Sequence, residues 1–180
     1  MTLASITIVS GCPGAGKATL ARELALLAED GLHLVSDTFY DFPARPIDPA
    51  TPAAHRQNAS MMRALGRAAG SFAEDGYAVF LDGVIGPWFL PVLVREIAPG
   101  VLLEYVVLQV GLEQTLNRVR QREGPGLSAG VVHMHRAFSE LGPLAHCALD
   151  TSSSSPAEVV AAFLARRRRN EFSVSREKLA

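Results

Sequence analysis

The feature that most constrains the fold is a short apolar strand that leads through a glycine-rich turn into a helix. Residues 3–9 are apolar and mostly β-branched (LASITIV), which is typical of a buried strand bounded by turn residues. Residues 17–29 repeat leucine at helical spacing, and Gly31 suits the end of that helix. The chain therefore opens with a strand–turn–helix unit.

The same alternation continues along the chain. Further strands are predicted at residues 32–35, 77–81, 102–110 and 145–149. Further helices are predicted at 53–74, 88–97, 113–122, 131–141 and from Pro156 onward. In the second helix we expect one apolar stripe to face the core, made of Met61, Leu65, Ala68 and Phe72. Apolar strands alternating with amphipathic helices are typical of an α/β protein with a parallel sheet covered on both faces.

Length and composition suit one domain with a real core. The chain has 180 residues, of which 48% are hydrophobic. We expect a single domain over residues 1–168, followed by a peripheral polar tail over 169–180. The arginine run at 166–169 reads as a solvated helix end, since no aromatic platform for nucleic acid accompanies it.

Charge, hydropathy and cysteine content argue against nucleic-acid-binding, membrane, disulfide-rich and zinc proteins. Basic and acidic residues nearly cancel, at 17 and 18, so no global charge favours nucleic acid or membrane partners. No apolar run is long enough to span a bilayer, and the start of the chain lacks the basic residues of a signal peptide. Cys12 and Cys147 form neither a disulfide framework nor a zinc pattern. We expect a cytoplasmic protein, monomeric or dimeric.

The turn at residues 11–19 reads GCPGAGKAT and nearly matches the phosphate-binding pattern G-x-x-x-x-G-K-[ST]. Its position between strand and helix is the required context. Backbone N–H groups of such a turn surround a phosphate, the helix start adds a positive dipole end, and Lys17 adds a point charge. We predict a nucleoside triphosphate there; the alternative is a chance glycine–proline turn. The expected contacts are Gly11, Pro13, Gly14, Ala15, Gly16, Lys17, Ala18 and Thr19.

One position departs from this pattern. Ala18 stands where a Ser or Thr hydroxyl normally contacts Mg²⁺. Thr19 does not simply replace it, because one helical step rotates a side chain by about 100°, and Thr19 suits an α-phosphate oxygen. Triphosphate binding should survive, with Mg²⁺ held by phosphates, water and a carboxylate elsewhere.

Two aspartates follow predicted strands at the edge where such sheets bind ligands. Asp37 follows the second strand and Asp82 the third. One could accept a proton from a hydroxyl substrate, and the other could hold Mg²⁺ directly or through water. Alternatively each is a cap or turn residue. Tyr40, just after Asp37, is a candidate substrate contact.

Several other residues have both a functional and a structural interpretation. Arg118 and Arg122 lie one turn apart before a glycine break, as phosphate-binding residues of a mobile lid would, but they also suit a solvated helix end. Arg56 could border an acceptor pocket or simply open a helix. Trp88 could wall that pocket or pack in the core.

Several stretches together resemble a known family. They are GCPGAGKAT (11–19), HLVSDTFY (33–40), HRQN (55–58), FLDGVIGPWFL (80–90), YVVL (105–108) and LGPLAHCALDT (141–151). They are similar to the small P-loop kinases of the zeta toxin and chloramphenicol phosphotransferase-like group. Within that group the chain looks like a bacterial branch of AAA-type ATP-binding proteins. The likeness covers roughly residues 4–165.

The resemblance implies a nucleoside-kinase-like P-loop fold: three α/β/α layers, a five-stranded parallel sheet in the order 2-3-1-4-5, and a small lid. It implies ATP as donor, Mg²⁺, and a small hydroxyl compound as acceptor. Asp37 would correspond to the base, Arg118 and Arg122 to the lid arginines, and the loop after Asp150 would border the adenine. Similar proteins usually carry Ser or Thr in place of Ala18, and the branch often has an aspartate in place of Thr38.

The leading hypothesis is an ATP-dependent phosphotransferase acting on a small hydroxylated molecule. A second hypothesis is a nucleotide-binding protein with weak or lost transfer, because Ala18 and Thr38 fall near the metal and the acceptor. A third is a nucleoside or nucleotide kinase. That reading needs a second phosphate-binding cluster, for which Arg45, Arg56 and Arg63 are the candidates.

Overall fold

The computed structural model describes residues 5–123 and 128–179, including all side chains in these ranges except those of 122, 123, 128, 129 and 178. Five parallel strands form one sheet in the order β2-β3-β1-β4-β5, as predicted. The strands are β1 (Ser5–Gly11), β2 (Gly31–Val35), β3 (Ala78–Asp82), β4 (Leu102–Gln109) and β5 (Ala148–Asp150). Their carboxyl ends therefore meet at one edge, where ligands bind in such sheets.

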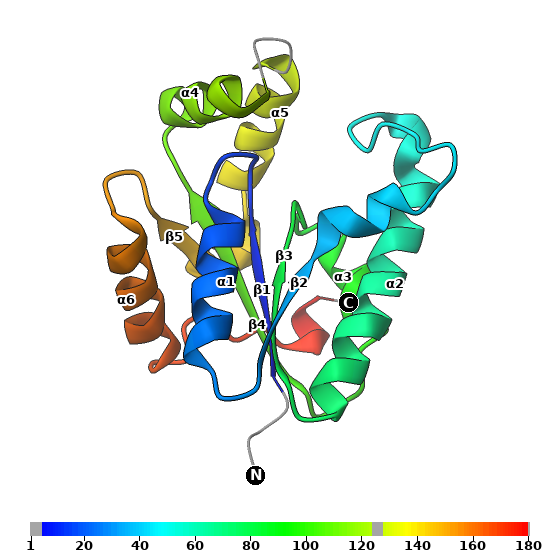
Figure 1. Ribbon diagram of the computed structural model, residues 1–180, viewed down its shortest axis with the longest axis vertical. Helices are drawn as coiled ribbons and strands as arrows, with labels where there is room; N and C mark the ends of the chain where they lie inside the picture. The colour runs from blue at the N-terminus through cyan, green and yellow to red at the C-terminus, as the bar shows by residue number, and fades with distance from the viewer. Residues whose placement is uncertain (1–4, 124–127, 180) are drawn as a thin grey trace.

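Helices cover both faces of the sheet (Figure 1). On one face lie α1 (Lys17–Leu27) and α6 (Pro156–Arg167), and on the other α2 (His55–Glu74) and α3 (Leu90–Val94). Two more helices, α4 (Leu112–Glu123) and α5 (Ser128–Ser139), stand at the top of Figure 1, over the carboxyl ends of the strands. The result is the predicted three-layer α/β/α arrangement.

Two predicted elements are shorter or displaced. The helix expected over 88–97 is regular only at Leu90–Val94, because tight turns flank it on both sides. The strand expected over 145–149 is a 3₁₀ helix at Gly142–Cys147, followed by a strand at Ala148–Asp150. This last strand begins only where β4 offers Val107 as a partner, so tertiary pairing overrides the local propensity.

The buried face of α2 is not the predicted stripe. Met62, Leu65, Ala69 and Ala73 are buried, whereas Phe72 is 37% exposed. The reason is close packing against α3: a Cβ on Gly66 would lie 2.3 Å from the carbonyl oxygen of Leu93. The two helices meet on the glycine side of α2, and this turns the predicted stripe partly outward.

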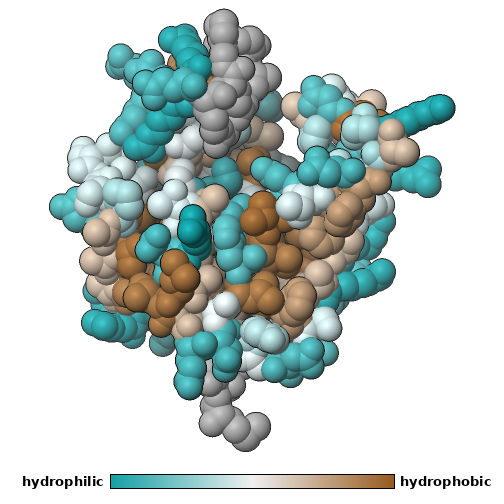
Figure 2. All heavy atoms as spheres, viewed as in Figure 1, coloured by the Kyte–Doolittle hydropathy of each residue, from teal (hydrophilic) through white to brown (hydrophobic). Residues whose placement is uncertain are grey.

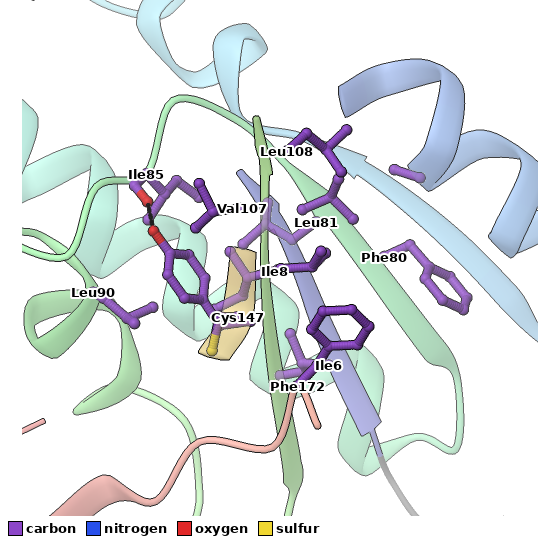
Figure 3. Close-up of a cluster of buried hydrophobic side chains, with 14 of the residues drawn as sticks. Ile6, Ile8, Phe80, Leu81, Ile85, Leu90, Val107, Leu108, Cys147 and Phe172 are labelled. Carbon is purple, nitrogen blue, oxygen red and sulfur yellow. Dashed lines mark hydrogen bonds between the residues drawn. The ribbon is translucent and has the colours of Figure 1, made fainter. Parts of the chain in front are cut away.

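The C-terminal segment is part of the core, which corrects the expected peripheral tail. Phe172 is fully buried, and Figure 3 shows it in the same apolar cluster as Ile6. Its carbonyl accepts a hydrogen bond from the Tyr105 N–H (2.9 Å), and the Val174 N–H donates to Leu103 O (3.1 Å). The segment thus continues the sheet along the part of β4 that β5 does not reach.

Two arginines of the 166–169 run are structural, which corrects the expectation of a fully solvated helix end. Arg166 donates to the carbonyl oxygens of Ala148 (2.5 Å) and His146 (2.6 Å), and its guanidinium lies 4.5 Å from the centroid of the Phe172 ring. Arg167 pairs with the buried Glu104 at 3.0 Å. These cations hold α6 and the C-terminal segment onto the sheet.

Replacing Phe172 with alanine should destabilise the fold strongly. Removing a fully buried ring costs about 3–5 kcal/mol, since a cavity remains. Urea unfolding followed by circular dichroism measures the change. Leu26→Ala, at a side chain 71% exposed, is the control and should stay within about 0.5 kcal/mol of wild type. Equal, small effects of the two substitutions would contradict the role of the segment in the core.

Among the described residues, no helix is long and apolar enough to cross a bilayer. Surface polarity is uneven (Figure 2). Apolar side chains gather on the face that contains α1 and α2, on either side of the edge strand β2. At the upper end, the visible surface around α4 is mostly hydrophilic.

Candidate active site

The glycine-rich turn has the backbone that a phosphate site needs. Gly11 ends β1, and Gly14 and Gly16 have positive φ values of 79° and 94°. At Gly11 a Cβ would lie 2.6 Å from Leu108 O, so only glycine allows β4 to approach. α1 starts at Lys17 with no side-chain cap at Gly16, which leaves its first N–H groups available to an anion.

The Lys17 side chain folds back over this turn. Its Nζ donates to the carbonyl oxygen of Cys12 at 3.1 Å. The ammonium therefore already lies at the loop and needs little rearrangement to meet a phosphate. The structure thus places the Lys17 ammonium at the loop.

Helix α4 closes over the loop. Arg118 donates from Nη1 to Gly14 O at 3.1 Å, and a Cβ on Gly14 would lie 3.4 Å from both Val119 Cγ2 and Thr115 O. The structure thus places the Arg118 guanidinium at the loop. The predicted partner Arg122 is one turn further along α4, and its side chain lies outside the described residues.

A cavity of about 280 Å³ extends from the loop to the segment after β5. Its polar lining comes from the loop, α4 and the residues after β5, while apolar side chains of β4, α1 and α6 complete it. The lining includes Gly14, Gly16, Thr19, Arg118, Thr151 and Ser154. Such a cavity suits the nucleoside end of a nucleotide whose phosphates lie on the turn. The sequence pointed to Thr19 directly and, through the family resemblance, to the loop after Asp150, which contributes Thr151 and Ser154 to this lining.

Asp82 lies beside the root of the loop. It ends β3, opposite Val9 of β1, and is 4% exposed. Its Oδ2 lies 2.5 Å from Nε2 of His33 on β2. Sequence reasoning missed His33, whose only signal was a polar residue inside an apolar strand.

The residues present fit a magnesium ion that is held mainly by phosphates. Among the described residues, no group of three or more His, Cys, Asp or Glu side chains could hold a metal by itself. Ala18 is exposed on the first turn of α1 and offers no oxygen. Asp82 provides a carboxylate at this edge, and Mg²⁺ commonly takes one or two carboxylates plus phosphates and waters.

Restoring the missing hydroxyl tests this account. Ala18→Ser should tighten Mg²⁺ binding to the nucleotide complex about tenfold, as expected for one added polar contact to a charged group. Titration of nucleotide binding against Mg²⁺ concentration measures the effect. Ala25→Ser, on the same helix, is the matched control. If both substitutions leave the Mg²⁺ dependence unchanged, the metal does not lie next to residue 18.

Asp37 lies on a 3₁₀ helix (Ser36–Asp41) that follows β2. It is exposed, and its Oδ1 accepts a hydrogen bond from Ser36 Oγ at 3.2 Å. Burial raises the pKa of Tyr40, and the nearby charge of Asp37 raises it further, so these two predicted residues lie together. Thr38 donates its hydroxyl to Val35 O at 2.7 Å, which commits that hydroxyl to the backbone.

Hydrogen bonds from two side chains of α2 hold the proline-rich segment over residues 42–54 in place. The amide of Gln57 bonds both the N–H and the carbonyl of Ile47 (2.9 and 2.8 Å), and Asn58 donates to Pro49 O (2.9 Å). In Figure 1 this segment projects from the upper end, across from α4 and α5. Residues 42–54 thus form an arm opposite α4 and α5. Arg56 is exposed and makes no hydrogen bond or ion pair within the described part of the chain.

Trp88 is not a core residue. Its side chain is 47% exposed, and its ring centroid lies 5.6 Å from that of Phe138 on α5. The ring also covers Gly86, where a Cβ would lie 2.3 Å from it. One side of the indole is thus packed and much of the rest is open, which suits a wall of a binding site.

Comparisons with solved structures support the fold. A sugar kinase from Janibacter sp. HTCC2649 is 20% identical with a TM-score of 0.67, over 89% of this chain and 92% of that one. A gluconokinase from Sinorhizobium meliloti 1021 is 18% identical with a TM-score of 0.69, over 94% and 97%. Thymidylate kinase from Candida albicans is 13% identical with a TM-score of 0.64, over 96% of each chain. At these identities the likeness establishes a P-loop kinase fold.

Sequence comparison places the chain in a family. No curated protein matches it in sequence at a significant level. Residues 7–127, from β1 through α4, match the AAA domain family AAA_18. That range contains the glycine-rich turn, both strand-end aspartates and Arg118. Residues 11–19 are hereafter called the P-loop, after the pattern that their sequence nearly matches. From the match over residues 7–127, the chain belongs to the AAA domain family AAA_18.

Proposed function

We propose that the protein is an ATP-dependent phosphotransferase that moves the γ-phosphate to a hydroxyl of a small molecule. The observation that carries the proposal is the shared edge of the sheet: Lys17 and Arg118 lie at the P-loop, and Asp37 follows β2 at the same edge. The finer assignment to the zeta toxin and chloramphenicol phosphotransferase-like group rests on the motifs at 33–40 and 80–90.

In this proposal the protein mainly positions charges. The acceptor oxygen forms a bond to the γ-phosphorus, the bond from that phosphorus to the β–γ bridging oxygen breaks, and ADP leaves. Asp37 takes the proton from the acceptor hydroxyl, and Lys17 neutralises charge on the β- and γ-phosphates. Arg118 contacts the nucleotide from α4, and Arg122 is proposed as the second lid arginine. When bound, Mg²⁺ neutralises phosphate charge; Asp82 would hold it, directly or through water.

Tyr40, Arg56 and Trp88 are the proposed acceptor contacts. Tyr40 lies next to Asp37, and Trp88 presents an open indole beside α5. Arg56, at the base of the arm, is exposed and could reach an acceptor. An acceptor between Tyr40 and Trp88 would meet one aromatic side chain from each side, which suits a small molecule with some apolar surface.

A second candidate function is nucleotide binding with weak or lost transfer. Two observations favour it: Ala18 offers no oxygen to a metal, and the Thr38 hydroxyl donates to the carbonyl oxygen of Val35. A nucleotide kinase has less support. Arg45, Arg56 and Arg63 are all exposed, and Arg63 donates to Ser60 on its own helix (3.0 Å), so they form no clear second phosphate site.

The test is transfer of labelled γ-phosphate from ATP, with Mg²⁺, into pooled small metabolites and hydroxyl-bearing antibiotics. A labelled product that Asp37→Asn fails to form supports the phosphotransferase and identifies the acceptor by fractionation. Calorimetry with ATP is run in parallel. Tight ATP binding without product from any pool favours the binding protein, and absence of ATP binding refutes both candidates.

A further inference from the structure

A half-buried histidine and a buried aspartate from neighbouring strands form a pair beside the P-loop. His33 lies in the middle of β2, and its side chain is 22% exposed, while that of Asp82 is 6% exposed. The register pairs His33 with Phe80 and Val35 with Asp82, so the imidazole reaches along the sheet to the end of β3. Because an ionised carboxylate only accepts hydrogen bonds, Nε2 of His33 donates to Oδ2 across their 2.5 Å separation.

The pair lies on the face of the sheet that α1 covers. Side chains alternate between the two faces along a strand, so Asp82 and Phe80 of β3 point to the same face. This is the face that α6 covers, because the guanidinium of Arg167 on α6 lies 6.0 Å from the centroid of the Phe80 ring. α1 packs beside α6 on that face. Asp82 and the start of α1, with Ala18, therefore belong to the same side of the sheet.

Only one oxygen of Asp82 is used by this contact. Within the described ranges, Oδ1 of Asp82 makes no hydrogen bond. It is also not fully buried, because Asn58 Oδ1 is the sole fully buried side-chain polar atom in these ranges that lacks a hydrogen-bond partner. Oδ1 of Asp82 therefore keeps contact with solvent at the carboxyl end of β3. The carboxylate is thus held by one oxygen, while the other stays available.

We propose that His33 is a positioning residue for the magnesium site: it fixes Asp82 through Oδ2 and directs Oδ1 toward the metal of the bound nucleotide. This rests on the proposed function. Polar partners of a ligating carboxylate set its orientation and tune metal affinity. A carboxylate held in this way matters more here, because Ala18 removes the usual hydroxyl ligand on the P-loop. The same strand then leads to Asp37, so β2 supports both the metal side and the acceptor side.

The test compares His33→Phe, which fills the space without a donor, with His33→Gln, which keeps an N–H donor near the position of Nε2. Mn²⁺ serves as the probe, and its affinity for the protein with a non-hydrolysable ATP analogue is measured by electron paramagnetic resonance. We expect His33→Phe to weaken Mn²⁺ binding about 10–100-fold and His33→Gln to recover most of it. Affinity for the analogue in EDTA should change less than about twofold, because Lys17 and the loop backbone are untouched.

The controls separate positioning from general damage. His133→Phe changes an exposed histidine on α5 and should bind Mn²⁺ as the wild type does. Asp82→Asn keeps a partner for His33 but loses the ligand charge, so it should weaken Mn²⁺ binding at least as much as His33→Phe. This variant also decides the matter if His33→Phe fails to fold: wild-type Mn²⁺ affinity in Asp82→Asn overturns the proposal.

Two further results would overturn it. One is wild-type Mn²⁺ affinity in a folded His33→Phe protein; the other is equal loss in His33→Phe and His33→Gln, which would mean that the imidazole only fills space. Failure of the proposed function looks different. A wild-type protein that binds Mn²⁺ with the analogue but transfers no phosphate refutes the phosphotransferase and leaves the His33 comparison intact.

Discussion

Lys17→Met should remove most of the affinity for ATP. The ammonium lies against the P-loop, 3.1 Å from Cys12 O, where the β- and γ-phosphates of a bound nucleotide would lie. Methionine keeps the length of the side chain and removes the charge. Loss of one partner from a buried charged contact costs about 2–5 kcal/mol, which corresponds to a decrease in affinity of thirtyfold or more.

Isothermal titration calorimetry with ATP, with and without Mg²⁺, measures this loss. Arg22→Met is the matched control, because it removes an exposed cation from the same helix. Screened surface charge contributes little, so the control should bind ATP within about twofold of wild type. Equal affinities of Lys17→Met and wild type would show that the nucleotide does not use this loop.

Asp37→Asn should abolish transfer while leaving ATP binding intact. Asparagine has nearly the same shape but cannot take the proton of the acceptor hydroxyl. Loss of a general base lowers the rate about 10²–10⁴-fold. Asp37 lies after β2 on a 3₁₀ helix and accepts a hydrogen bond from Ser36, whereas Lys17 starts α1 and bonds Cys12 O, so nucleotide affinity should stay within about twofold.

The readout is the rate of labelled-phosphate transfer to the acceptor found in the pooled assay, measured at saturating ATP. Asp41→Asn provides the comparison, since it changes an exposed carboxylate at the other end of the same 3₁₀ helix. We expect near-normal turnover in that variant. Similar losses from both substitutions would point to the charge of the segment as a whole, and an unchanged rate in Asp37→Asn would remove it as the base.

The proposed nucleotide site and the proposed acceptor site differ in which elements hold their residues in place. The nucleotide side is built on β1, α1 and α4, with Arg118 already bonded to Gly14. The acceptor side depends on the arm, which Gln57 and Asn58 hold in place through backbone groups. If the proposed function holds, acceptor choice is expected to follow from this arm and from Trp88. Substitutions there should change which compound is phosphorylated more than ATP affinity.

A structural feature could be predicted from the sequence when the residues that determine it lie close together in the chain. The P-loop, its preceding strand and its following helix were predictable, because glycine placement and apolar periodicity act within a few residues. The sheet order followed from the family resemblance. The face of α2 was predicted wrongly, because Gly66 lets α3 approach on a side that periodicity alone does not reveal.

By itself, the sequence determined the P-loop, the alternating α/β order and the two aspartates at strand ends, since each depends on local backbone geometry or on a short motif. Only the tertiary structure decided that Phe172 completes the core, that β5 starts at Ala148 and that His33 holds Asp82. In each of these cases the partners lie 40 or more residues apart in the chain or pair across the sheet. Such contacts form only when the strands are in register, and register depends on how the buried faces of several strands pack together rather than on one segment alone.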